Sequence, residues 1–177
     1  PNGHVPCYCK NHVPTAEEKA AAKKKALEDA SKLVEKYKKE FPKGTPLVCA
    51  CEKGRLEDVR VLVEGHDVEK TGMSVDEMVS KEGKDSGGTS YTPLEMAVQY
   101  EQLEIVQFLV KTCPTVDLIG KTNKDGKSSL HYAAMYSTKN VDLLQFLIDN
   151  YNGKDIKDII NQKNKYEETP LDNAYWY

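Results

Sequence analysis

Apolar residues recur at helical spacing near the start of the chain, in residues 15–42. They form one stripe at Ala26, Leu27, Ala30, Leu33, Val34, Tyr37 and Phe41. Spacing of three or four residues predicts an amphipathic helix, and Thr15 followed by Glu18 is a capping-box pattern at its start. Pro42 ends the helix. Because a lone helix would leave its apolar stripe in water, we expect this one to cover the end of another structure.

A second pattern then repeats four times along the chain. It consists of Thr-Pro-Leu or a remnant of it, at 45–47, 92–94, 128–130 and 169–171, with Ala three residues after each Leu. In the first three copies a further apolar pattern of helical spacing follows. Proline fits the first turn of a helix, where its missing N–H costs nothing, and the residue before it can cap. The small Ala allows two helices to approach closely, so the pattern predicts helical hairpins.

These segments resemble the ankyrin-repeat family. The residues that carry the resemblance are GTPLVCACEKGRLEDVRVLVEG at 44–65, KDGKSSLHYAA at 124–134 and NQKNKYEETPLDNA at 161–174. The resemblance covers residues 43–177, with repeats starting near 43, 90, 126 and 167, and it implies an all-α solenoid of helix-turn-helix units. It also implies a scaffold that binds another protein, with no catalysis and no cofactor.

The chain departs from the regular repeat of about 33 residues. An insertion occupies residues 65–90, in which Ser74 and Glu77 predict a short capped helix. Residues 83–90 contain three Gly and no apolar anchor, so we expect them to be mobile. Residues 155–160 predict another helical turn. The fourth repeat stops within its first helix without a polar cap, so we expect the natural protein to continue.

Charge limits the classes of partner. The net charge is −3, which divides into +3 for residues 15–43, −7 for residues 44–177 and +1 for Lys10. An acidic body with only two Arg does not suit nucleic-acid binding, which needs a basic face. It favours a protein partner with a basic surface. Apolar stretches are only a few residues long, so we expect no membrane span, and we expect a monomer.

The cysteines indicate a reducing, intracellular compartment. Five Cys at irregular spacing are a poor disulfide framework. We therefore expect a cytoplasmic protein, with delivery into a host cell as an open alternative. In the extended segment 1–14, His4, Cys7, Cys9 and His12 are weak zinc candidates, because a single residue between the thiolates strains the site. Two alternatives to a binding module stay open: a metal-binding module in residues 4–12, and a regulatory or targeting segment of a larger enzyme.

The resemblance also implies which residues contact a partner. They lie in the turn tips before Thr-Pro-Leu and after the Ala that follows it, on the concave face. In this chain they are Glu52, Tyr91, Gln99, Tyr100, Asp125, Lys127, Met135, Tyr136, Tyr166, Glu168 and Trp176. Aromatic residues are enriched here, as in protein interfaces, and we expect Tyr91, Tyr100 and Tyr136 to form one row. His131 matches a structural histidine that bonds the backbone of neighbouring turns.

Overall fold

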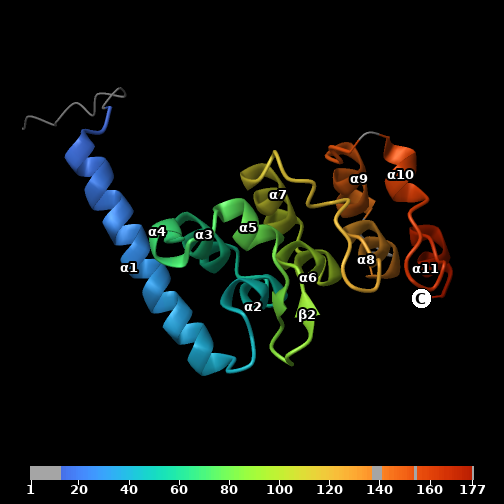
Figure 1. Cartoon of the computed structure of the whole chain (residues 1–177), viewed down its shortest axis with the longest axis horizontal. Helices are drawn as coiled ribbons and strands as arrows, with labels where there is room; N and C mark the ends of the chain where they lie inside the picture. Colours follow the sequence, from blue (N-terminus) through green and yellow to red (C-terminus); the bar gives the residue numbers. More distant parts are fainter. Residues whose placement is uncertain (1–12, 137–140, 154, 177) are drawn as a thin grey trace, which may run out of the picture.

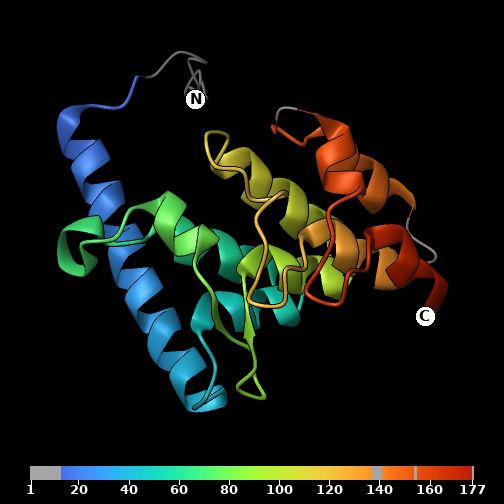
Figure 2. The same ribbon diagram turned by 45° about the vertical axis from the view of Figure 1, so that its right-hand side comes forward.

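The computed structural model describes residues 13–136, 141–153 and 155–176, and its helices form two rows (Figures 1 and 2). The first helices of successive hairpins lie side by side in chain order, namely α2 (Pro46–Glu52), α6 (Pro93–Gln99), α8 (Ser129–Tyr136) and α11 (Pro170–Trp176). The second helices form the other row, namely α3 (Leu56–Glu64), α7 (Leu103–Thr112) and α9 (Val141–Asp149). The expected all-α solenoid is confirmed.

Local chemistry accounts for the shape of each hairpin. Proline occupies the first turn of α2 and α6, and Thr92 closes a full capping box with Glu95 at the start of α6. Ala50 and Ala97 are completely buried, which lets the two rows approach closely. Gly54 has a φ of 65° in the turn between α2 and α3, a backbone conformation that suits glycine.

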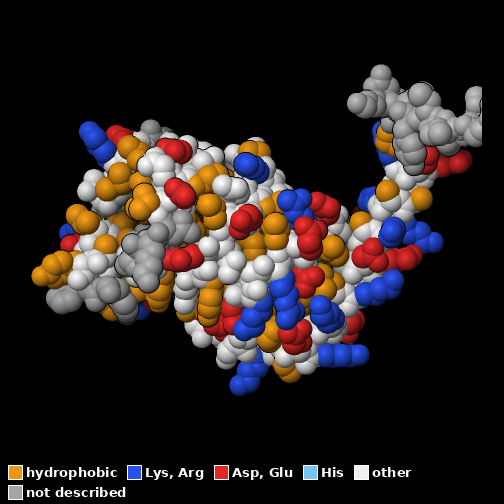
Figure 3. Space-filling model, turned by 180° about the vertical axis from the view of Figure 1, so that it is seen from behind, with side chains coloured by type: hydrophobic (Ala, Val, Ile, Leu, Met, Phe, Trp, Pro, Cys, Tyr) orange, Lys and Arg blue, Asp and Glu red, His pale blue; other side chains and the backbone are white. Residues whose placement is uncertain are grey.

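The hydrophobic core lies between the two rows and runs along the stack. The leucine of the Thr-Pro-Leu pattern contributes the same contact in each of the first three hairpins, because Leu47, Leu94 and Leu130 are 5%, 1% and 4% exposed. In the last hairpin the equivalent Leu171 is 77% exposed, and Tyr175 on the same helix is 85% exposed. Figure 3, viewed from behind, shows apolar side chains gathered at this end of the stack and charged ones along the opposite end.

Helix α1 (Ala16–Glu40) covers the other end of the stack, against α3 and α2. Its apolar stripe supplies Tyr37, which is 1% exposed and whose hydroxyl donates to Asp58 Oδ2 at 2.8 Å. Arg55 makes a two-pronged hydrogen bond to Glu40, at 2.7 and 3.0 Å. The first turns of α1 project beyond the body (Figures 1 and 2), and all residues from 16 to 25 are exposed.

The insertion between the first two hairpins is folded. It contains α4 (Val68–Thr71), α5 (Val75–Ser80) and two short antiparallel strands, β1 (Gly83–Lys84) and β2 (Ser90–Tyr91), paired Gly83 to Tyr91 and Lys84 to Ser90. Helix α5 begins with a capping box made by Ser74 and Glu77. A further short helix, α10 (Ile156–Ile160), is capped at its start by Asp155 and buries Ile159.

Residues 83–90, which the composition predicts to be mobile, are tied to the first repeat by hydrogen bonds. The N–H of Thr45 donates to Lys84 O at 2.7 Å, and the N–H of Lys84 donates to Thr45 Oγ1 at 2.8 Å. The N–H and hydroxyl of Ser86 donate to the Glu52 carboxylate at 2.8 and 2.7 Å. Hydrogen bonds to α2 and to its N-cap residue therefore hold the β-hairpin on the first repeat, in place of the apolar contacts that hold other segments.

Candidate functional site

The expected contact residues lie in two kinds of place, where the first helix of a hairpin ends and in the turns that precede such helices. Tyr100 is the C-cap of α6, Tyr136 is the last residue of α8, and Tyr91 belongs to β2. Because the first helices stack side by side, these positions recur along one surface of the solenoid.

Three tyrosine rings are in contact on this surface, and Tyr100 lies near one of them. The ring of Tyr132 lies between two others: its centroid is 6.1 Å from that of Tyr91, edge to face, and 6.4 Å from that of Tyr136, stacked. Both arrangements are ones that aromatic pairs prefer. Tyr132 is 7% exposed and its hydroxyl accepts a hydrogen bond from Asn123 Nδ2 at 2.8 Å. We call Tyr91, Tyr100, Tyr132 and Tyr136 the tyrosine row.

Two members of the tyrosine row face solvent. Tyr100 is 47% exposed and Tyr136 is 37% exposed. Tyr91 is half-buried, and its pKa is raised by burial first and then by the nearby Asp85, Tyr136 and Tyr100. Tyr91 is therefore near the other three rings, Tyr136 stacks on the buried Tyr132, and Tyr100 and Tyr136 present accessible aromatic area.

Several expected contact residues are engaged within the chain instead. Glu52 is 8% exposed and binds Ser86 and Lys53; burial alone would raise its pKa, but those hydrogen bonds lower it. Met135 is 6% exposed, and Gln99 is half-buried. Glu52 and Met135 therefore present little side-chain surface to a partner in this structure.

The remaining expected contact residues lie in the turns toward the end of the stack. Asp125 accepts from Lys165 Nζ at 2.5 Å, which ties two successive turns together. Glu168 Oε2 accepts from the side-chain amides of Asn164 and Asn173 at 2.9 and 3.0 Å. Tyr166 is 60% exposed, and Lys127 Nζ lies 3.6 Å from Met135 Sδ. Trp176 belongs to α11, and its side chain lies outside the described residues.

His131 is fully buried and joins two turns. Its Nδ1 accepts from the N–H of Ser128 at 3.1 Å, and its Nε2 lies 3.2 Å from the backbone oxygen of Glu168. Burial lowers the pKa of His131, so the ring is neutral and its Nε2–H donates to that oxygen. This is the structural role that the resemblance implied.

The next question is whether the described residues form a metal site or a membrane span. His4, Cys7, Cys9 and His12 lie outside it, and within it no three His, Cys, Asp or Glu residues gather as metal ligands do. No helix there is long and apolar enough to cross a membrane.

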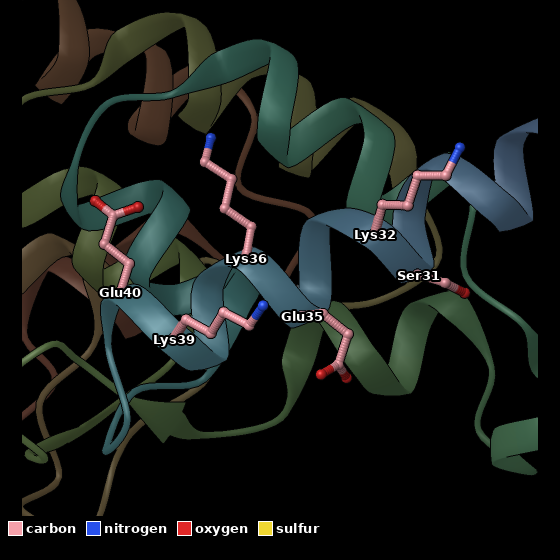
Figure 4. A pocket seen from close by; sticks show the side chains of 6 residues that line it. All are labelled: Ser31, Lys32, Glu35, Lys36, Lys39 and Glu40. Carbon is pink, nitrogen blue, oxygen red and sulfur yellow. The ribbon is translucent and has the colours of Figure 1, made fainter.

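One hollow lies along the polar face of α1. It measures about 810 Å³ and is lined by six residues of that helix alone, Ser31, Lys32, Glu35, Lys36, Lys39 and Glu40. Figure 4 shows these side chains diverging from the helix rather than converging on a point. A solvated helix face of this kind offers no enclosed site.

Comparison with known proteins agrees with the hairpin architecture. A family model described as "Ankyrin repeats (3 copies)" matches residues 19–118 and 70–164. A search of curated proteins finds no match. The two matched ranges together reach from α1 to beyond α10 and cover more than half of the chain. The chain therefore belongs to the ankyrin-repeat family.

Proposed function

We propose that this chain is a protein–protein interaction module that binds a partner protein along the tyrosine row. Ankyrin repeats are generally such modules, and the family is typically non-catalytic. The single observation that carries the proposal is the exposure of two tyrosines on one surface, namely Tyr136, which stacks on the buried Tyr132, and Tyr100. Tyrosine offers a large apolar area, a polar handle and few rotamers to freeze, which suits a binding anchor.

We propose further that the partner presents a basic surface. Residues 44–177 contain 15 basic and 22 acidic residues, a net charge of −7. Opposite charge on the partner would speed association and disfavour acidic competitors. Arg and Lys side chains also bind the faces of aromatic rings, so basic residues of the partner would suit the tyrosine row as well as the net negative charge of residues 44–177.

Photo-crosslinking tests this proposal without knowledge of the partner. A benzophenone amino acid placed at Tyr100 should crosslink a partner in a lysate, whereas one at the exposed Lys157 should not. Tyr100→Ala and Tyr136→Ala should then weaken binding of the captured partner by about 1–3 kcal/mol, with nearly unchanged melting temperatures. A large loss of stability without an effect on binding would show that the rings are packing residues only.

A further inference from the structure

The insertion between the first two repeats brings a carboxylate to the tyrosine row. Strands β1 and β2 pair Gly83 with Tyr91 and Lys84 with Ser90. Because side chains alternate between the two faces of a strand, Asp85 lies on the same face of this β-hairpin as Tyr91, and Lys84 lies on the other face. The burial pattern agrees, since Asp85 and Tyr91 are half-buried whereas Lys84 and Ser90 are exposed.

Asp85 is held in position by the turn that it starts. Its N–H donates to Thr89 O at 2.8 Å, and its Oδ1 accepts the N–H of Thr89 at 2.7 Å. The next residue, Ser86, binds the Glu52 carboxylate and so fixes the hairpin on the first repeat. Among the described residues Asp85 has no ion-pair partner and its Oδ2 accepts no hydrogen bond. This oxygen is therefore available to a cation.

Tyr91 is the common neighbour of Asp85 and the two exposed rings. Its pKa is raised by burial first, then by Asp85, and then by Tyr136 and Tyr100. The next contributor is Glu95, which is 1% exposed and which a partner cannot reach. The charged groups with the largest effects on Tyr91 are thus both carboxylates, and Asp85 is the accessible one.

The lysines near the tyrosine row do not cancel this charge. Lys53 donates to Glu52 at 2.6 Å, and Lys165 donates to Asp125, so each of these pairs is neutral. Lys127 lies in the turn before α8 and is not among the groups with the largest effects on the pKa of the rings that Asp85 and Asp125 influence. The surface beside the accessible rings therefore carries the uncompensated negative charge of Asp85.

We propose that Asp85, together with the exposed rings of Tyr100 and Tyr136, binds an arginine side chain of the partner, so that the insertion sets the specificity of the tyrosine row. This inference rests on the proposed function, because it names the partner residue that the same surface selects. A guanidinium plane stacks on an aromatic face, and its N–H groups donate to a carboxylate. The ring faces and the carboxylate are both negative, so one cationic group satisfies them together.

Fluorescence anisotropy of defined peptides tests the charge selectivity. The probe is a short fluorescein-labelled peptide with three Arg separated by Gly and Ser, and its counterparts carry Lys or the neutral citrulline in place of Arg. We expect the wild-type chain to bind the Arg peptide most tightly and the citrulline peptide most weakly. Asp85→Asn should weaken binding of the Arg peptide about fivefold, because asparagine can still accept the N–H of Thr89 but carries no charge.

Glu64→Gln is the matched control. Glu64 is an exposed residue of α3, in the other row of helices, so loss of its charge should alter binding less than about twofold. Circular dichroism melting of both variants checks that the fold is intact. Equal affinity for the Arg and citrulline peptides would overturn the proposal, and so would equal effects of Asp85→Asn and Glu64→Gln.

The partner captured by photo-crosslinking separates this inference from the proposed function. Weaker partner binding in Tyr100→Ala, Tyr136→Ala and Asp85→Asn alike would support both. Weaker binding in the two tyrosine variants with an effect of Asp85→Asn below about twofold would leave the proposed function standing and overturn the role of Asp85. No effect of the tyrosine variants would overturn the proposed function itself, and the arginine site with it.

Discussion

Glu95 provides a direct test of how burial acts on one charge in this fold. It is the third residue of α6, it is 1% exposed, and its Oε2 accepts the N–H of Thr92 at 2.7 Å. Its other carboxylate oxygen has no hydrogen-bond partner among the described residues. Burial raises the pKa of Glu95 to about 7, and the hydrogen bonds from Thr92 only partly oppose this.

The raised pKa makes the stability of the fold depend on pH. Below pH 4.5 the carboxyl is protonated in both the folded and the unfolded state. Between pH 4.5 and about 7 only the folded state keeps the proton, so the free energy of unfolding falls as the pH rises. Above pH 7 the loss is complete, and the difference between the two pKa values corresponds to about 3 kcal/mol.

Glu95→Gln should remove this dependence. Glutamine keeps the shape and the capping bond to Thr92 but cannot ionise. Urea denaturation followed by circular dichroism should therefore find the variant more stable than the wild type by about 3 kcal/mol at pH 8 and by less than about 1 kcal/mol at pH 5. Glu77→Gln is the matched control, because Glu77 holds the same capping position in α5 but is exposed and has a lowered pKa. That control should gain no stability at pH 8. An equal difference between Glu95→Gln and wild type at every pH would refute the reasoning.

Three further substitutions test the packing of the stack, each by the free energy of unfolding in urea. Tyr37→Ala should lower the free energy of unfolding by about 3–5 kcal/mol, because it empties the contact between α1 and α3. A change of less than about 0.5 kcal/mol, as is usual for a surface substitution, would mean that α1 does not stabilise the stack. Leu94→Ala should cost about 2–5 kcal/mol, whereas Leu171→Ala, at the same repeat position but exposed, should cost less than about 0.5 kcal/mol; similar costs would contradict the difference in burial between these two leucines. Glu101→Gly should gain about 1 kcal/mol, because Glu101 has a φ of 55° where the first repeat has Gly54 at 65°, and a loss would mean that the Glu101 side chain makes a compensating contact.

The hairpins were predictable because their signals are local. The Thr-Pro-Leu pattern sets the start of α2, α6 and α11 through proline geometry, with a threonine cap added in α6 and α11 but not in α2, and the following Ala permits close helix contact. The capping boxes of α1 and α5 each depend on only two residues that are close in the sequence, and both form in the structure. A local signal of this kind does not depend on how distant segments meet.

The fate of residues 83–90 was not predictable in the same way. The bonds that hold this hairpin join Lys84 to Thr45 and Ser86 to Glu52, across separations of 39 and 34 residues. The composition of the segment shows that it has no apolar anchors, but it does not show that a carboxylate on another helix can accept its hydrogen bonds. The same bonds explain why Glu52, which the repeat pattern predicts as a contact residue, is buried, because the insertion brings Ser86 onto its carboxylate.

Tyr132 shows why repeat position alone does not define the binding surface. Beside the buried His131, it has the position of a core residue, and at 7% exposure it is one. Yet its ring supports both Tyr91 and Tyr136, so the tyrosine row is continuous with the core. Removal of Tyr132 should therefore disturb stability and binding together and could not separate them. Tyr100 has no aromatic ring partner among the described residues and is the most exposed of the four, so its replacement separates a loss of partner contact from a loss of packing most cleanly.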